Sequence, residues 1–362
     1  MLSGCQMFII NSRHYGYFIA KNVYLLLLLI SLLTCGPIAL SSATTPGAFY
    51  FIGSGARARA LGNAFVAVAD DASAVYWNPA GIDQLESPVL MVMDRITTLD
   101  TNYVNLAGVL PVNDTIGTVG FNVIFFSVDD IPIFDDLANP GGELTDKEWA
   151  LAFSYAYGIR GISFGVNFKA LYQRIGDGQG NEIGVARTRG TGIDLAILYQ
   201  MTENFRVGVV LHEDIKLRDL DDAEGYTATI PRSITTGLFY QIPLGSKHRW
   251  RLMADFEQRR KLPLRLHLGS ELALYRVSTQ SMEEGTNRAE FFSFSLRAGL
   301  NDVVLEPRGA EISFSELFRS NLKPTLGIGG AKTLGETLLK LDYAASFEEI
   351  GVRHFLSIST EF

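Results

Sequence analysis

Charged side chains lie at alternate positions in several segments that are otherwise apolar. They are Arg251, Asp255, Arg265, His267, Glu271 and Arg297. Alternate residues of a β-strand share a face, so these side chains are predicted to point one way and their apolar neighbours the other. A histidine among carboxylates could act as a general base, but a hydrolytic site also needs a serine beside it, and no serine is positioned for that role. We therefore expect a network of paired ions and no enzymatic activity, because buried charges are stabilised by pairing.

Acidic residues gather in two other segments, 128–147 and 214–230. Carboxylates could bind Ca²⁺, but the first segment lacks the spacing of a calcium-binding loop. The acids of the second segment are interpreted as solvated charge. We expect no metal and no cofactor.

Cysteine usage and net charge exclude further classes of site. Both cysteines, Cys5 and Cys35, precede residue 44, and the rest of the chain has none. It therefore offers no disulfide, thiol nucleophile or thiolate metal site. The net charge of −8, without a basic stripe, argues against a nucleic-acid partner.

From residue 87 onward, apolar residues recur at every second position in segments of about ten residues, which is the period of β-strands. We predict strands at 88–99, 103–112, 116–127, 148–158, 161–174, 191–200, 204–213, 231–241, 248–258, 264–276, 290–300, 323–333, 336–346 and 353–362. Fourteen is an even number, as a closed antiparallel barrel requires. The apolar face dominates and the charges lie opposite, which indicates lipid outside and a polar lumen inside. The connections are alternately short and long, which is also typical of outer-membrane barrels.

The one long apolar run, at 23–33, is too short to span a bilayer as a helix. It follows Arg13 and Lys21 and precedes Ala43, an arrangement typical of a secretory signal. We predict a signal peptide at residues 1–43, with cleavage after Ala43. A start at Met7 and a lipoprotein signal at Cys35 are alternatives.

The segment 44–86 is rich in glycine and alanine and is predicted to form short helices. Asp70 and Asp71 are suited to capping a helix that begins at residue 72, and Asn78 to capping a second one that begins at Pro79. Gly62 and Gly81 are the expected ends. So short a unit cannot bury its own apolar face, so it must pack inside something larger.

Residues of this segment carry a resemblance to a known family. They are Gly55, Arg57, Gly62, Asp70, Asp71, Asn78, Pro79 and Ala80. The pattern resembles the start of the PorV/PorQ family of outer-membrane proteins and, more distantly, the FadL-like transporters of long-chain fatty acids. The resemblance implies an all-β membrane protein: a 14-stranded antiparallel transmembrane β-barrel at 87–362, closed by an N-terminal plug at 44–86. Arg57 and Arg59 of the plug would then pair with lumenal acids such as Asp255, Glu271 or Asp342.

The resemblance also implies a location and partners. The protein would lie among the lipids of the outer membrane of a diderm bacterium, and the terminal Phe362 resembles the signal that the barrel-assembly machinery reads. In FadL-like proteins, apolar outer loops form the first landing site for a hydrophobic ligand. Here the candidates are Ile131, Ile133, Phe134 and Leu137, which could instead fold over the mouth of the barrel.

Two functions therefore remain open. In the first, the barrel passes small hydrophobic molecules across the outer membrane by a passive route that the plug gates. In the second, it is a PorV-like component of the type IX secretion system that binds secreted cargo proteins. An apolar lumen would favour the first, and an exposed apolar loop patch above a blocked lumen would favour the second.

Overall fold

The computed structural model describes residues 48–96, 101–113, 115–134, 140–176, 186–220, 227–245, 247–281, 287–305, 322–348 and 351–362. None of the helices in these ranges is both long and apolar enough to cross a membrane. The predicted signal peptide lies outside the described residues, and the boundaries predicted for it and for the plug stay predictions.

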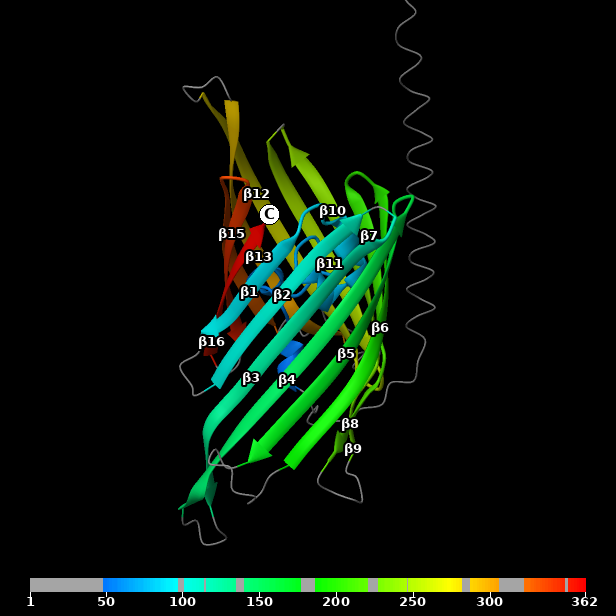
Figure 1. The fold of residues 1–362 in the computed structure, drawn as a ribbon, viewed down its shortest axis with the longest axis vertical. Coiled ribbons are helices and arrows are strands. Elements are labelled where there is room, and N and C mark those ends of the chain that lie inside the picture. The colour runs from blue at the N-terminus through cyan, green and yellow to red at the C-terminus, as the bar shows by residue number, and fades with distance from the viewer. Residues whose placement is uncertain are drawn as a thin grey trace, which may run out of the picture.

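Fourteen antiparallel strands form a closed barrel (Figure 1). Strands adjacent in sequence pair along the chain, β7 pairs with β10, and β1 pairs with β16 to close the ring. The prediction of a 14-stranded barrel is confirmed. The barrel strands are β1 Val89–Ile96, β2 Thr101–Asn113, β3 Gly117–Phe134, β4 Pro140–Ile159, β5 Ile162–Gly176, β6 Ala186–Thr202, β7 Phe205–His212, β10 Ser233–Leu244, β11 His248–Arg259, β12 Leu264–Ser281, β13 Asn287–Leu305, β14 Lys323–Leu334, β15 Thr337–Glu348 and β16 Gly351–Glu361.

The barrel has two distinct ends. Short turns join β2 to β3, β4 to β5, β6 to β7, β10 to β11 and β14 to β15 at the end where β16 finishes, which we call the turn end. The opposite end, where β6 and β10 begin, is called the loop end.

A hairpin of β8 (Ile215–Asp219) and β9 (Thr227–Ile230) lies between β7 and β10 in sequence. It pairs with β6 at Thr188 and Arg189 and lies outside the ring of barrel pairings. The predicted strands leave 214–230 as a connection, which is wrong for these two strands. β8 does alternate, with Ile215 and Leu217 buried and Lys216 and Arg218 exposed, but over a stretch much shorter than the segments of about ten residues that were assigned as strands.

The two faces of the wall differ in composition, as β4 illustrates. Its outward side chains are exposed and large: Trp149, Leu151, Phe153 and Tyr155. Its inward side chains are buried and small: Ala150, Ala152, Ser154 and Ala156. This apolar exterior suits a hydrocarbon environment, in which closed strand pairing also satisfies the backbone.

Residues 48–85 form a plug inside the barrel (Figure 1). Its elements are η1 Ala48–Ile52, α2 Ala56–Ala60, α3 Ala74–Trp77 and η2 Pro79–Gln84. The helix α2 contacts β13 to β16, whereas η2 contacts β3 to β6, so the plug reaches both sides of the lumen. Leu61, Phe65, Val68 and Val75 are fully buried, because the plug and wall together enclose the apolar face that the plug alone could not cover.

The predicted helix starts are close to the observed ones. The Asn78 side chain accepts a hydrogen bond from Ala80 N, and Pro79 begins η2. The helix predicted from residue 72 begins at Ala74, and its N-cap is Ser73 without a side-chain capping bond, so the predicted capping by Asp70 and Asp71 is wrong. Asp71 instead accepts hydrogen bonds from the backbone and hydroxyl of Ser73. Gly81 does not end its helix, which continues to Gln84. A side chain at Gly81 would collide with Ala69, so this glycine serves a close contact.

The segment 128–147 was predicted to be an outer loop, and that prediction is wrong for most of it. Ile131, Ile133 and Phe134 belong to β3, and β4 begins at Pro140. Register shifts between Val128 and Ile131 and between Ile133 and Phe134 break the two-residue period, which is why the sequence pattern stops short of the strand end. Leu137 lies outside the described residues. The strands predicted at 264–276 and 290–300 are likewise longer, because β12 runs to Ser281 and β13 starts at Asn287.

Candidate functional site

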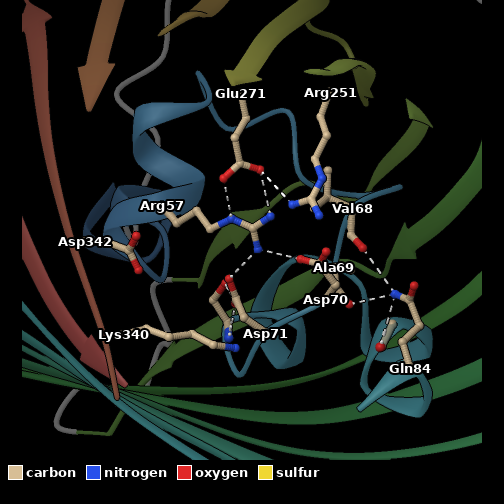
Figure 2. A network of polar contacts seen from close by, with 12 residues as sticks. Arg57, Val68, Ala69, Asp70, Asp71, Gln84, Arg251, Glu271, Lys340 and Asp342 are labelled. Atoms are coloured by element: carbon tan, nitrogen blue, oxygen red, sulfur yellow. Dashed lines mark hydrogen bonds and ion pairs between the residues drawn. The ribbon is translucent and has the colours of Figure 1, made fainter. Parts of the chain in front are cut away.

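A network of charges joins the plug to the wall (Figure 2). Arg57 of α2 forms ion pairs with Asp70 at 2.5 Å, with Asp71 at 3.3 Å and with Glu271 of β12 at 3.1 Å. Glu271 also pairs with Arg251 at 3.0 Å and with Arg297 at 2.8 Å. Three guanidinium groups from three elements thus surround one buried carboxylate.

The network extends on both sides of this centre. Arg297 reaches Asp342 of β15 at 2.6 Å. On the plug, Gln84 donates hydrogen bonds to the carbonyls of Val68 and Ala69, which fixes the chain beside Asp70 (Figure 2). The network therefore runs from Asp342 of the wall through Arg297, Glu271 and Arg57 to Asp70 of the plug.

The pKa of the Asp70 carboxyl group is lower than its ordinary value. Burial would raise the pKa of its carboxyl group, but the nearby guanidinium groups of Arg57 and Arg206 outweigh burial and lower the pKa to about 2. Asp70 is therefore ionised at neutral pH and keeps its pairing with Arg57.

The partners expected for Arg57, Arg59 and the lumenal acids are only partly those observed. Arg57 pairs with Glu271 as expected. Arg59 pairs with Glu348 at 3.5 Å. Asp255 accepts hydrogen bonds from the backbone N–H groups of Phe65 and Val66, at 2.8 and 2.9 Å.

Two of the six predicted lumenal residues form a separate cluster nearer the loop end. Arg265 pairs with Asp302 at 2.7 Å. His267 lies 3.0 Å from the amide oxygen of Asn301 and 3.6 Å from Glu257. All six residues line the lumen side of the wall, but Arg251, Glu271 and Arg297 form one network, Arg265 and His267 belong to another cluster, and Asp255 binds the plug backbone.

A further cluster, around Asp194, was not predicted from the sequence. Lys169 and His212 lie 2.6 and 2.8 Å from Asp194. Alternation along a strand indicates which side chains point inward. It does not give the register between strands, which places Asp194 opposite His212.

The glycines of the plug motif allow close approach to the wall and within the plug. Gly62 has φ +64°, and a Cβ there would lie 2.6 Å from the carbonyl oxygen of Leu268. Gly55 has φ +82° and packs on Ser73. Ala80 fits against Gly165 of β5, where a larger wall residue would collide with the η2 backbone. These positions dock the plug and do not present chemistry.

A cavity lies on each side of the plug, and the two share no lining residue among those described. The loop-end cavity has a volume of about 90 Å³. The plug lines it with Tyr50, Phe51, Tyr76 and Trp77, and the wall with polar residues that include Lys169, His212, Ser233, Thr235 and Arg259.

The turn-end cavity has a volume of about 220 Å³. The charged network around Arg57 bounds it toward the plug. The wall there carries small inward residues: Ser293, Ser295, Gly329, Ala331, Ser357 and Ser359. These short side chains leave space between the plug and one side of the barrel.

Comparisons with known proteins identify the type of fold through one solved structure. The model of one family, described as an uncharacterised protein family (UPF0164), matches residues 45–215. No curated protein matches the chain. The crystal structure of the P. putida toluene transporter TodX is similar with a TM-score of 0.50 and 13% identity, over 86% of this chain and 99% of that one. This chain has a FadL-like barrel fold.

Two further solved structures show weaker similarity. The CymD monoaromatic hydrocarbon channel matches with a TM-score of 0.49 and 14% identity, over 86% of this chain and 97% of that one. A Pseudomonas aeruginosa FadL homologue matches with a TM-score of 0.47 and 10% identity, over 90% and 99%.

Proposed function

We propose that the protein passes small hydrophobic molecules across the outer membrane by a passive route between the plug and the wall. The observation that carries this proposal is the pair of cavities at opposite ends of the lumen, with the plug between them. A molecule entering at the loop end meets the aromatic rings of the plug, and one leaving at the turn end passes along β13, β14 and β16.

The plug acts as the gate in this proposal. Arg57, Asp70 and Asp71 line the turn-end cavity on the side of the plug, and Arg57 pairs with both aspartates and with Glu271 of the wall. A small shift of α2 away from Glu271 would join the cavities without unfolding the barrel. The remaining partners of Glu271, Arg251 and Arg297, would keep its charge compensated during that shift.

The outer membrane is the proposed location. The apolar exterior of the closed barrel and the likeness of its fold to TodX, a toluene transporter, support it. The predicted signal peptide would supply export. Membership of the PorV/PorQ family and a role in type IX secretion stay hypotheses from the sequence, and the comparisons do not favour that role.

The test is uptake of radiolabelled toluene by intact diderm cells that lack other uptake barrels, with and without this protein in the outer membrane. The proposal predicts faster uptake that saturates with toluene concentration and needs no energy source. An unrelated barrel of similar size, expressed to the same level, controls for membrane damage. Equal uptake with both barrels would refute the proposal.

A further inference from the structure

The loop-end cavity has two chemically different sides. On the plug side, the Tyr76 hydroxyl already donates to the carbonyl of Tyr50 at 2.6 Å, and the Trp77 indole N–H donates to the carbonyl of Ser54 at 2.7 Å. The two rings are also packed edge to face, with centroids 4.8 Å apart. Their polar atoms are therefore occupied, and they offer apolar ring surface to the cavity.

Two cations on the wall side, Lys169 and Arg259, are already paired. Lys169 binds Asp194 at 2.6 Å, and Arg259 binds Glu257 at 2.7 Å. Both cations also lie over plug rings, Lys169 over Tyr50 and Arg259 over Phe51. A charged ligand would have to break one of these pairs, so the cavity favours a neutral molecule.

Two hydroxyl groups on the same wall, those of Ser233 and Thr235, take no part in these ion pairs. Ser233 and Thr235 lie two residues apart on β10, so their side chains share the lumenal face. They are 6% and 7% exposed, and neither side chain makes a hydrogen bond to another described residue. Both residues line the cavity, so a ligand with a hydrogen-bonding group would meet two free hydroxyls there.

The size of the cavity limits the ligand. Its volume is about 90 Å³. One water-sized group needs about 10–15 Å³ by this measure, so the space suits a single small ring. A fused ring system or a long acyl chain would not fit without displacing the plug.

From these features we infer that the loop-end cavity is a binding site for a small neutral aromatic molecule carrying a hydroxyl group. The ring lies against Tyr76 and Trp77, and the hydroxyl exchanges hydrogen bonds with Ser233 and Thr235. This inference rests on the proposed function, since it names the class of molecule that the route selects. It predicts preference for a phenol over the hydrocarbon of the same shape.

Phenol and toluene are the matched probes, because they differ by a hydroxyl in place of a methyl group. Trp77 is one of three tryptophans in the chain, and the other two, Trp149 and Trp250, are exposed on the outer face. In a W149F/W250F protein, fluorescence of Trp77 in detergent micelles reports binding in the cavity. We expect phenol, after correction for partition into micelles, to bind more tightly than toluene.

Ser233→Ala and Thr235→Val test the hydroxyl contacts. Each should weaken phenol binding about threefold to tenfold, the usual effect of one lost hydrogen bond, and leave toluene binding unchanged. Ser295→Ala is the matched control, because it removes a buried hydroxyl from the turn-end cavity. Unchanged phenol binding in the double variant, or equal loss for both probes, would overturn the inference.

The failure of this site can be told apart from the failure of the route. If cells with the protein take up toluene but the variants bind phenol as the wild type does, only the binding site is refuted. If Trp77 reports hydroxyl-dependent binding while cells take up neither probe, the site stands and the passive route is refuted.

Discussion

Glu271 concentrates more ion pairs than any other single carboxylate of the described residues. It is 1% exposed and accepts hydrogen bonds from Arg57, Arg251 and Arg297. The favourable pairing offsets the cost of burying the charges, so the balance depends on keeping all partners. Removing the central charge would leave three guanidinium groups repelling one another between plug and wall.

The first prediction is therefore that Glu271→Gln destabilises the folded barrel. We expect the free energy of unfolding to fall by about 3–5 kcal/mol, as when one partner of a buried ion pair is removed. Urea unfolding in detergent micelles measures the change. Glu361→Gln is the control, since its pair with Lys340 is over a quarter exposed and should contribute at most about 1 kcal/mol. Equal effects of the two substitutions would contradict this account of the network.

The second prediction concerns Asp70 and pH. Its folded-state pKa of about 2 lies below the ordinary value of 3.8, so its ionised form stabilises the fold. The contribution, about 2 kcal/mol, is present above about pH 4 and is lost as the pH falls through 2. The difference in unfolding free energy between wild type and Asp70→Asn should therefore shrink over that range. The comparison cancels the effect of other acids, because they titrate in both proteins. A difference in unfolding free energy that does not vary with pH would contradict the pairing of Asp70 with Arg57.

At the scale of elements, the plug docks through backbone contact at Gly62. This residue follows α2 with φ +64°, and a Cβ there would also lie 2.7 Å from the backbone N and O of Leu300. Gly245 has a similar φ of +70°, but no atom lies within 4 Å of where its Cβ would be. Substituting each glycine by alanine therefore separates the free-energy cost of a left-handed backbone from the cost of a steric collision.

We predict that Gly62→Ala costs clearly more than Gly245→Ala. The control should lose about 1–2 kcal/mol from backbone strain alone, and Gly62→Ala about 1–3 kcal/mol more from overpacking. Gly62→Ala should also make the plug more sensitive to protease in the intact barrel. Limited proteolysis followed by mass spectrometry measures this, and an undisturbed plug would show that the contact at Leu268 and Leu300 does not hold it.

The wall strands were predictable from the sequence because they keep a two-residue period over most of their lipid-facing length. The failures lie where that period is broken. The bulges after Val128 hide the end of β3, and the alternation in β8 and β9 is much shorter than in the barrel strands. Gly81 was taken as a helix end because isolated sequence does not reveal its contact with Ala69.

Across the whole molecule, the composition of the lumen could be predicted but its connectivity could not. The alternation of apolar and charged residues along each strand was enough to place Arg251, His267 and Glu271 inside the barrel. Which charges meet depends on strand register and on the path of the plug, which no local pattern encodes. Arg59 illustrates the point, because it pairs with Glu348 rather than with one of the acids expected from the sequence. The cavities follow from the same long-range arrangement.

The proposed route makes a last prediction, because it runs through the turn-end cavity beside β13. Ser295 is inward and 7% exposed, whereas Ala298 on the same strand faces outward and is exposed. Ser295→Trp should fill the cavity and reduce toluene uptake by at least about tenfold, since a packed lumen leaves no path, whereas Ala298→Trp should leave uptake near wild type. Ser295→Leu should give an intermediate rate of toluene uptake. It serves as the test if the tryptophan impairs assembly of the barrel, which heat-modifiable migration on gels would reveal. If an assembled Ser295→Trp barrel takes up toluene as the wild type does, the molecules do not pass between the plug and this side of the wall.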